Sequence, residues 1–287
     1  MDILVTGGNG FIGSNLIERL IEEGHYVISV DNLSSGKKEN CVSYANYMYT
    51  DINDIDVLDF NADLVYHLAA LSRIQPSFNK PDETFKSNVL GTEKVMEWAR
   101  LKNAKVVYAG SSSIHHDPYQ SPYAMYKYLG EEVVKMYKKV YGMNAEIARF
   151  YNVYGPREIV GDQENDGAAV IGIWRDQINN NKPLTIVGDG NQKRDFTHVD
   201  DIVDGLWRIG MKDEKHKDAW ELGSGKNYSI NEVYGMFRKK FKTKYKHIPD
   251  QAGNYPSTLQ INDDAQRKLG YAPQDRLEKY IKSLWFK

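Results

Sequence analysis

Short apolar runs alternate with amphipathic segments along the first half of the chain. The runs predict strands at residues 2–6, 26–31, 47–50, 63–68, 105–110 and 145–151. Apolar positions at helical spacing predict helices at residues 11–23, 81–102 and 123–141. Strands that alternate with helices over short links are expected to be parallel and joined by right-handed crossovers. The expected fold is therefore α/β, a Rossmann-type doubly wound parallel sheet.

The second half of the chain has a less regular pattern. Glycine and polar clusters at 155–167 and 188–195 predict loops, and helices are expected near residues 168–181, 199–211, 229–241 and 273–284. We expect a smaller α+β lobe over the carboxyl ends of the strands, where ligands of open α/β sheets bind. The predicted division is a Rossmann domain over residues 1–155, to which residues 196–223 return, and a smaller lobe over residues 156–287.

Composition narrows the class of protein. The chain has 287 residues, of which 41% are hydrophobic and 26% charged, as in ordinary soluble globular proteins. The formal net charge of -2 gives no basic footprint for nucleic acid or a membrane surface. No apolar run approaches the roughly 20 residues needed to cross a bilayer. The single cysteine, Cys41, excludes an internal disulfide. We expect a cytoplasmic protein with no metal site, no membrane contact and no nucleic-acid partner.

A glycine-rich segment, residues 7–13, directly follows the first predicted strand and opens the first helix. Glycines allow the backbone to turn tightly and to approach a pyrophosphate at the helix N-terminus, and the three positions that matter are Gly7, Gly10 and Gly13. The next strand ends in Asp31, where a carboxylate accepts hydrogen bonds from a ribose diol and repels a 2′-phosphate. This context favours a dinucleotide site over an ordinary tight turn, and NAD over NADP.

Tyr123 and Lys127 are four residues apart and therefore lie on one face of the helix predicted after the fifth strand. A nearby ammonium stabilises a phenolate, so that Tyr123 can act as a base near neutral pH. The pair follows the serine triplet 111–113 at the carboxyl end of a buried strand, where a hydroxyl can bind a substrate oxygen. This position predicts a catalytic site; the alternative is an incidental pair on a surface helix.

Further motifs follow in order along the chain: TGGNGFIG (6–13), HLAA (67–70), NVLGT (88–92), the serine triplet, the Tyr–Lys pair, FYNVYGPR (150–157), RDFTHVDD (194–201) and LGSG (222–225). As an ordered set they resemble the extended short-chain dehydrogenase/reductase family, and most of all its NAD-dependent sugar-nucleotide epimerases and dehydratases. The resemblance covers nearly the whole chain and implies that the smaller lobe binds the substrate.

The resemblance implies a role for each matching residue. Tyr123 is expected to be the base, Lys127 its electrostatic partner and nicotinamide-ribose anchor, and Ser111 the hydroxyl that orients the reacting oxygen. Besides the glycines and Asp31, the residues expected to contact NAD are Phe11, Ile12, Asn32, Asp51, Ile52, Leu68, Ala69, Ala70, Asn88 and Tyr151. Those expected to hold the nucleotide sugar are Ser112, Asn152, Arg194 and residues 167–170, which include Ala169 and Val170.

The residues after Ser111 bear on the reaction. Members of this family first oxidise C4 of the sugar to a ketone. Similar dehydratases then use an Asp-Glu pair directly after the catalytic hydroxyl, and decarboxylases tend to keep a Glu there. This chain has Ser112 and Ser113, which are poor proton carriers at neutral pH. A 4-epimerase needs neither group. We therefore expect 4-epimerisation of a UDP-hexose, with 4,6-dehydration and UDP-glucuronate decarboxylation as the alternatives.

Two features depart from the family pattern. The loop between Ser111 and Tyr123 is much shorter than in relatives and carries His115 and His116, which we interpret as a solvated loop. The pocket is therefore expected to be more open or to be completed by a partner subunit. In addition, Gln251 stands where the family often carries an arginine that contacts the diphosphate.

Other classes and assemblies are weaker alternatives. Residues 249–262 resemble ADP-heptose 6-epimerases, but residues 159–171 lack the lysine that this branch uses as a second acid/base. A dinucleotide-sensing regulator on the same fold commonly loses the Tyr–Lys pair, and a methyltransferase has no use for it. Relatives dimerise through two helices, so we expect a homodimer through residues near 88–102 and 123–141.

Overall fold

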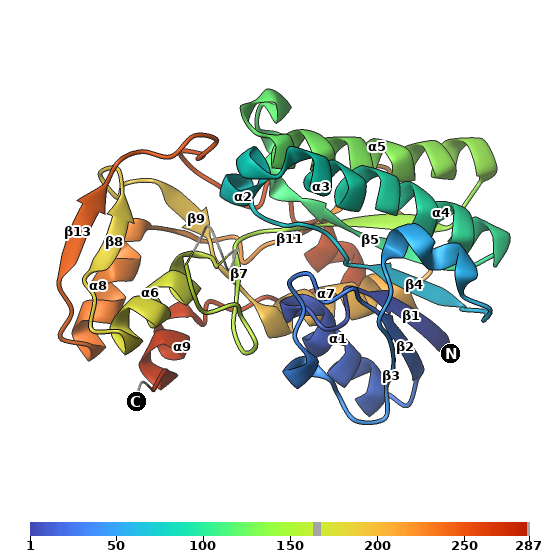
Figure 1. Ribbon diagram of the computed structural model, residues 1–287, viewed down its shortest axis with the longest axis horizontal. Coiled ribbons are helices and arrows are strands. Elements are labelled where there is room, and N and C mark those ends of the chain that lie inside the picture. The colour runs from blue at the N-terminus through green and yellow to red at the C-terminus, as the bar shows by residue number, and fades with distance from the viewer. Residues whose placement is uncertain (163–167, 286–287) are drawn as a thin grey trace.

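The structure is a computed structural model that describes residues 1–162 and 168–285. Within these residues a parallel, seven-stranded sheet forms the centre of the molecule, in the order β11-β6-β5-β4-β1-β2-β3 (Figure 1). Its strands are β1 (Asp2–Thr6), β2 (Tyr26–Val30), β3 (Asn46–Met48), β4 (Leu64–His67), β5 (Lys105–Ser111), β6 (Ala145–Phe150) and β11 (Trp220–Leu222). The predicted doubly wound α/β sheet is confirmed.

Helices cover both faces of the sheet. Helices α1 (Phe11–Glu22) and α7 (Val199–Met211) pack on one face, and α4 (Gly91–Leu101) and α5 (Pro122–Tyr141) on the other. Successive residues of β1 point to alternate faces, so that Ile3 and Val5 join one hydrophobic core and Leu4 the other. Burial on both faces explains why the central strands are mostly apolar.

The segment predicted as one helix over residues 81–102 is not a single α-helix. It consists of α3 (Pro81–Phe85), a π-helical turn (Lys86–Leu90) and α4, and a short helix α2 (Ile74–Asn79) precedes it. A π turn inserts an extra residue into a helical ladder and often marks a functional site. Here the π turn carries Asn88, whose side chain accepts a hydrogen bond from the Leu71 N–H at 2.8 Å and donates one to the Leu71 carbonyl at 2.9 Å.

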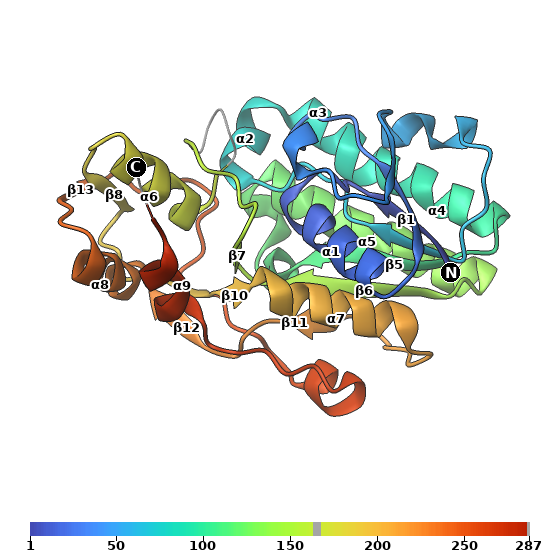
Figure 2. The same ribbon diagram turned by 90° about the horizontal axis from the view of Figure 1, so that it is seen from below.

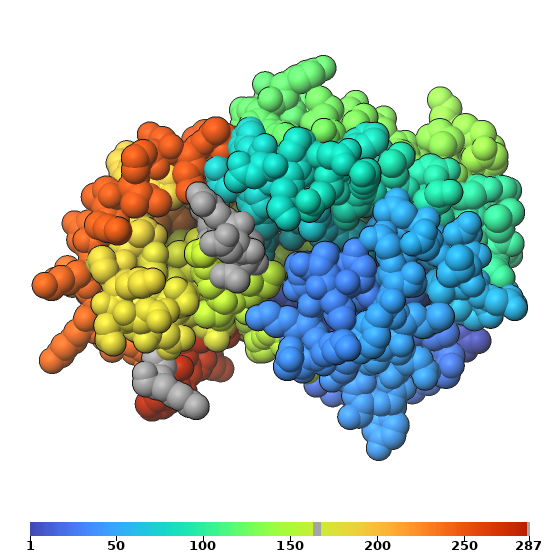
Figure 3. All heavy atoms as spheres, viewed as in Figure 1, coloured from blue at the N-terminus to red at the C-terminus, as the bar shows by residue number. Residues whose placement is uncertain are grey.

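A second group of elements gathers at one end of the molecule, beside the carboxyl ends of the strands (Figures 1, 2 and 3). It contains the parallel pair β8 (Leu184–Val187) and β13 (Tyr245–Ile248), with α6 (Val170–Asn179), α8 (Ile230–Lys240) and α9 (Leu277–Ser283) around a core that includes Trp174 and Phe237. Two small pairs join this group to the sheet: β7 (Val153–Tyr154) with β10 (Thr197–His198), and β9 (Lys193–Asp195) with β12 (Asn227–Ser229).

A buried guanidinium connects α5 to the edge of the central sheet. Arg149 on β6 is 3% exposed and forms ion pairs with Glu131 of α5 at 2.7 Å, with Asp218 at 2.7 Å and with Glu221 of β11 at 3.1 Å. The Tyr151 hydroxyl donates a further hydrogen bond to Glu221 at 2.6 Å. Although burial disfavours a charged arginine, the bonds to Glu131 and Asp218 raise the pKa of Arg149 above its usual range.

Replacing Arg149 with alanine should lower the free energy of unfolding by about 3–5 kcal/mol, because Glu131 and Glu221 would stay buried without their cation. Urea denaturation followed by circular dichroism measures this. Arg267→Ala is the matched control: its pair with Asp263 is 61% and 66% exposed, so its loss should leave stability nearly unchanged. Equal effects of the two substitutions would show that the buried network does not stabilise the fold.

Candidate active site

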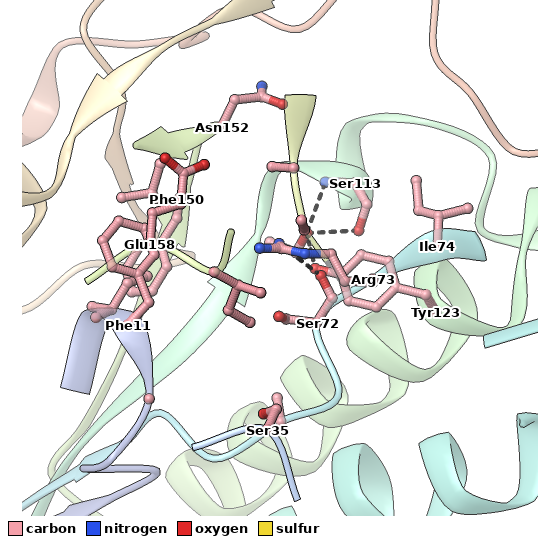
Figure 4. Close-up of a pocket in the computed structure, with 18 of the residues that line it drawn as sticks. Phe11, Ser35, Ser72, Arg73, Ile74, Ser113, Tyr123, Phe150, Asn152 and Glu158 are labelled. Atoms are coloured by element: carbon pink, nitrogen blue, oxygen red, sulfur yellow. Dashed lines mark hydrogen bonds between the residues drawn. The ribbon is translucent and has the colours of Figure 1, made fainter. Parts of the chain in front are cut away.

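A cavity of about 460 Å³ lies between the carboxyl ends of the strands and the second group of elements (Figure 4). This volume lies within the usual range for small-ligand sites. Nearly all residues that the sequence predicted for cofactor, catalysis and substrate line it: Gly7, Gly10, Phe11, Ile12, Gly13, Asp31, Asn32, Asp51, Ile52, Leu68, Ala69, Ala70, Ser111, Ser112, Tyr123, Lys127, Asn152, Ala169, Val170 and Arg194. Positions spread over most of the chain therefore meet at one site.

The glycine-rich turn after β1 has no room for side chains. Gly7 has a φ of +72°, and a Cβ there would lie 2.8 Å from the backbone nitrogen of Ala69. A Cβ on Gly13 would overlap the carbonyl oxygen of Gly7. Helix α1 begins directly after Gly10 without a side-chain cap, so its first N–H groups have no side-chain acceptor at the cap. This turn provides the backbone cradle and helix N-terminus that a dinucleotide pyrophosphate requires.

Asp31 directly follows β2 and lines the same cavity. It is buried, and its carboxylate accepts hydrogen bonds from the N–H groups of Asn9 at 2.9 Å and Leu33 at 2.8 Å. Burial raises the pKa of Asp31 above its ordinary value, although these two bonds favour the ionised form. A fixed carboxylate beside the glycine turn suits a ribose diol, so the residues present fit NAD.

Ser111, Tyr123 and Lys127 come together as predicted. The Ser111 Oγ and the Tyr123 hydroxyl are 3.2 Å apart, and Ser113 Oγ donates a hydrogen bond to Ser111 Oγ at 2.9 Å. Lys127 is buried and donates to the carbonyl of Ala109 at 2.5 Å and to the Tyr108 hydroxyl at 3.0 Å. Burial lowers the pKa of Lys127, while Tyr123 and Glu131 oppose this shift.

Polar groups on the opposite part of the cavity suit an anionic ligand. Arg194 donates to Asn254 Oδ1 at 2.5 Å and to the carbonyl of Lys193 at 2.8 Å, and no carboxylate among the described residues pairs with it. Burial lowers the pKa of Arg194 to about 10. A desolvated guanidinium without a carboxylate partner favours the binding of a phosphate group. Asn152 lies nearby and donates to Thr258 Oγ1 at 2.9 Å.

Two predicted contacts, Asn88 and Tyr151, do not line the cavity. Asn88 holds the main chain of Leu71, and the Tyr151 hydroxyl is bound to Glu221. Both residues support the segments that form the cavity wall. Of the predicted base-flanking residues 167–170, residue 167 lies outside the described residues. In the described part of the chain no three His, Cys, Asp or Glu side chains are grouped as metal ligands.

Sequence reasoning missed two charged residues of the cavity, Arg73 and Glu158. Glu158 is 6% exposed, and its carboxylate oxygens form no hydrogen bond of good geometry among the described residues, although the backbone N–H groups of Gly155 and Gly172 lie close enough to interact with them. Burial raises the pKa of Glu158 to about 8, against the opposing charges of Arg175 and Arg73. Figure 4 shows Glu158 and Tyr123 on opposite sides of the cavity, with Arg73 between them. The only sequence signal is their position: Arg73 is the third residue after the HLAA motif, and Glu158 directly follows FYNVYGPR.

Comparison with known proteins gives consistent results. The model of the NAD dependent epimerase/dehydratase family matches residues 3–223. A UDP-glucose 4-epimerase of Mycolicibacterium smegmatis is 32% identical over 98% of this chain and 96% of its own. A UDP-glucuronic acid decarboxylase of Arabidopsis thaliana is 32% identical over 80% of this chain and 55% of its own. The structure of UDP-glucose 4-epimerase from Thermotoga maritima with UDP-glucose superimposes with a TM-score of 0.90 at 28% identity, covering 98% of this chain and 96% of that one.

The buried carboxyl of Glu158 should make stability depend on pH. Below its ordinary pKa of 4.5 the carboxyl is protonated in both states. Between pH 4.5 and about 8 the unfolded chain has lost this proton and the folded chain retains it, so stability falls as pH rises, by at most about 1.4 kcal/mol per pH unit. The Glu158→Gln substitution should remove this contribution. Its free energy of unfolding, measured by urea denaturation at pH 5, 6.5 and 8, should therefore decline less steeply with pH than that of the wild-type protein. Parallel declines in both proteins would mean that Glu158 is ionised in the folded state.

Proposed function

The chain belongs to the NAD dependent epimerase/dehydratase family, and we propose that it catalyses the 4-epimerisation of a UDP-hexose with NAD as cofactor. The observation that carries this proposal is the group of Ser111, Tyr123 and Lys127 in one cavity, with hydroxyls rather than carboxylates directly after Ser111. These three side chains can transfer a proton at a sugar hydroxyl. The residues directly after Ser111 provide no acid that could expel a second hydroxyl from the sugar.

The chain's own residues supply binding, orientation and proton transfer. The glycine turn and Asp31 would hold NAD, which supplies a reversible hydride acceptor at C4 of the sugar. The phenolic oxygen of Tyr123 takes the proton of the C4 hydroxyl and later gives it back. The buried ammonium of Lys127 stabilises the phenolate, and Ser111 hydrogen-bonds the same sugar oxygen. Inversion requires that the ketone present its other face before the hydrogen returns.

Groups on the far wall suit the nucleotide diphosphate. We assign the diphosphate to Arg194 and Asn152, because the guanidinium is desolvated and faces the cavity without a carboxylate partner among the described residues. Ala169 and Val170, at the start of α6, would flank the base. The Mycolicibacterium relative and the Thermotoga structure both carry the name UDP-glucose 4-epimerase, and the latter was solved with UDP-glucose, which favours a UDP-hexose.

Glu158 favours a second candidate function. It is a buried carboxyl whose raised pKa keeps a proton available near neutral pH, on another wall of the cavity than the serines. Sugar-nucleotide 4,6-dehydration and uronate decarboxylation need an additional acid, and the Arabidopsis relative is named a decarboxylase. A dinucleotide-sensing regulator is disfavoured by the complete catalytic group.

We also propose a cytoplasmic homodimer. Apolar side chains on and beside α4 and α5 are partly solvent-exposed, among them Leu90, Leu101, Met136, Val140 and Tyr141. An amphipathic pair of helices with such residues can pack against its copy as a four-helix bundle. No helix in the described part of the chain is long and apolar enough to cross a membrane.

The purified protein, without added NAD, should convert one UDP sugar to its 4-epimer. Proton NMR with UDP-glucose, UDP-GlcNAc, UDP-glucuronate and dTDP-glucose as separate substrates tests this. The epimer is expected because a cofactor that is reoxidised in each cycle need not be replaced. A 4-keto-6-deoxy product or released carbon dioxide would contradict the epimerase assignment and favour Glu158 as the additional acid.

Tyr123→Phe should reduce turnover at least about 100-fold, since it removes the proton-transferring group and keeps the ring. Initial rates of 4-epimer formation, followed by proton NMR, measure this, and circular dichroism checks folding. Tyr128→Phe, on the same helix but facing solvent in part, is the matched control and should retain wild-type rates. Undiminished turnover in Tyr123→Phe would remove Tyr123 from the mechanism.

A further inference from the structure

Residues 251–255, here called the strap, cross beside the cavity on the way from β13 to α9. The carbonyl of Ala252 accepts a hydrogen bond from Gln75 Nε2 at 2.8 Å, and Asn254 accepts from Arg194. Gly253 has a φ of +73°, and a Cβ there would lie 2.9 Å from Ile74 Cγ2 and 3.2 Å from the carbonyl oxygen of Gln120. The strap is therefore in close contact with the segments that flank the catalytic residues.

Tyr255 ends the strap with its ring in the cavity wall. The residue is 6% exposed, and its hydroxyl forms no hydrogen bond of good geometry among the described residues, although Ser113 lies close enough to interact with it. A buried hydroxyl that is at most weakly bonded is costly, so a polar group of a bound ligand would stabilise it. Burial raises the pKa of Tyr255 to about 12, which keeps the hydroxyl protonated and able to donate.

The short loop between Ser111 and Tyr123 holds this ring in place. His116 stacks on Tyr255, with ring centroids 4.0 Å apart and planes 9° from parallel. Burial and the charges of His115 and Arg194 lower the pKa of His116, so the stack joins two uncharged rings near neutral pH. His115 contacts Glu221 at 3.0 Å and thereby anchors the loop to β11. The expectation of a solvated loop is therefore met only in part: both histidines are half-buried, whereas Asp117, Tyr119 and Gln120 are exposed.

The surroundings of the Tyr255 hydroxyl indicate which part of a ligand it meets. Ser113 lies close enough to lower the pKa of Tyr255, and its Oγ donates to Ser111 Oγ, which lies 3.2 Å from the Tyr123 hydroxyl. These hydroxyls therefore lie on the side of the cavity where Tyr123 would meet the sugar. On the other side of the strap, Asn254 bonds to Arg194, the residue assigned to the diphosphate.

We propose that Tyr255 is a sugar-positioning residue, which donates a hydrogen bond to a hydroxyl of the hexose and is held in place by His116. This inference rests on the proposed function, because it requires a nucleotide sugar in the cavity. It extends that function by placing a second phenol beside the sugar, from a segment far from Tyr123 in the sequence. The strap thereby covers the site where the short loop leaves it open.

Tyr255→Phe tests the proposal, since it keeps the ring and the stack and removes only the hydroxyl. Calorimetry with UDP-glucose and with UDP as separate ligands of the NAD-loaded protein compares the two affinities. The Kd for UDP-glucose should rise about 5- to 10-fold, the value of one hydrogen bond, and the Kd for UDP should not change. Tyr119→Phe is the matched control, because Tyr119 lies on the same loop but is 84% exposed.

Two histidine variants test the stack separately. His116→Ala should weaken UDP-glucose binding and leave UDP binding as it is, and His116→Phe should restore the lost affinity, since it supplies an aromatic face of similar size. A merely structural role of His116 would instead lower stability and both affinities together. Thermal unfolding of each variant distinguishes these outcomes.

Three results would overturn the proposal. An unchanged Kd for UDP-glucose in Tyr255→Phe would mean that the hydroxyl does not bind the sugar, and equal weakening of UDP and UDP-glucose would place it on the diphosphate. Failure of the wild-type protein to bind UDP-glucose would overturn this inference together with the proposed substrate. A wild-type protein that binds UDP-glucose with the expected Tyr255 dependence, but forms no 4-epimer, would contradict only the proposed reaction.

Discussion

The close approach of α5 to β5 is the constraint on which the site depends. A Cβ on Gly130 of α5 would overlap the hydroxyl oxygen of Tyr108 on β5, and a Cβ on Gly110 of β5 would lie 2.7 Å from a carboxylate oxygen of Glu131 on α5. Only glycine at both positions lets the helix come near enough for Lys127 to reach the Ala109 carbonyl. The 3.2 Å distance between Ser111 Oγ and the Tyr123 hydroxyl follows from that packing, because Ser111 ends β5 and Tyr123 lies in the first turn of α5.

Buried charged side chains are of two kinds: some are paired within the fold, and others face the cavity. The Arg149 guanidinium has three carboxylate partners, so it fixes α5, β6 and β11 relative to one another. Arg194 and Glu158, by contrast, face the cavity without such partners among the described residues, and their pKa values are shifted towards the neutral forms. Desolvated groups of this kind favour ligand binding, because a bound phosphate or hydroxyl replaces the hydrogen bonds that water no longer provides.

The sequence predicted the fold and most of the cavity because their signals are local. Strand and helix periods place β1 to β6 and the helices between them, and glycines in the first turn identify the dinucleotide cradle. The π turn at Asn88 was missed because apolar spacing hardly changes across one extra residue. Arg73, Glu158 and Tyr255 were missed for another reason: each lies on an irregular segment whose side chains reach the cavity only through tertiary packing.

The short catalytic loop shows how such packing changes the interpretation of a sequence. A deletion between Ser111 and Tyr123 predicts an open pocket when it is considered alone. In the folded chain the stack of His116 on Tyr255 joins this loop to the strap. The proposed sugar contact of Tyr255 accordingly comes from the segment after β13 and not from the catalytic loop. Because Asn254 of that segment also bonds to Arg194, the groups assigned to sugar and diphosphate belong to one connected structure and should respond together to changes in the strap.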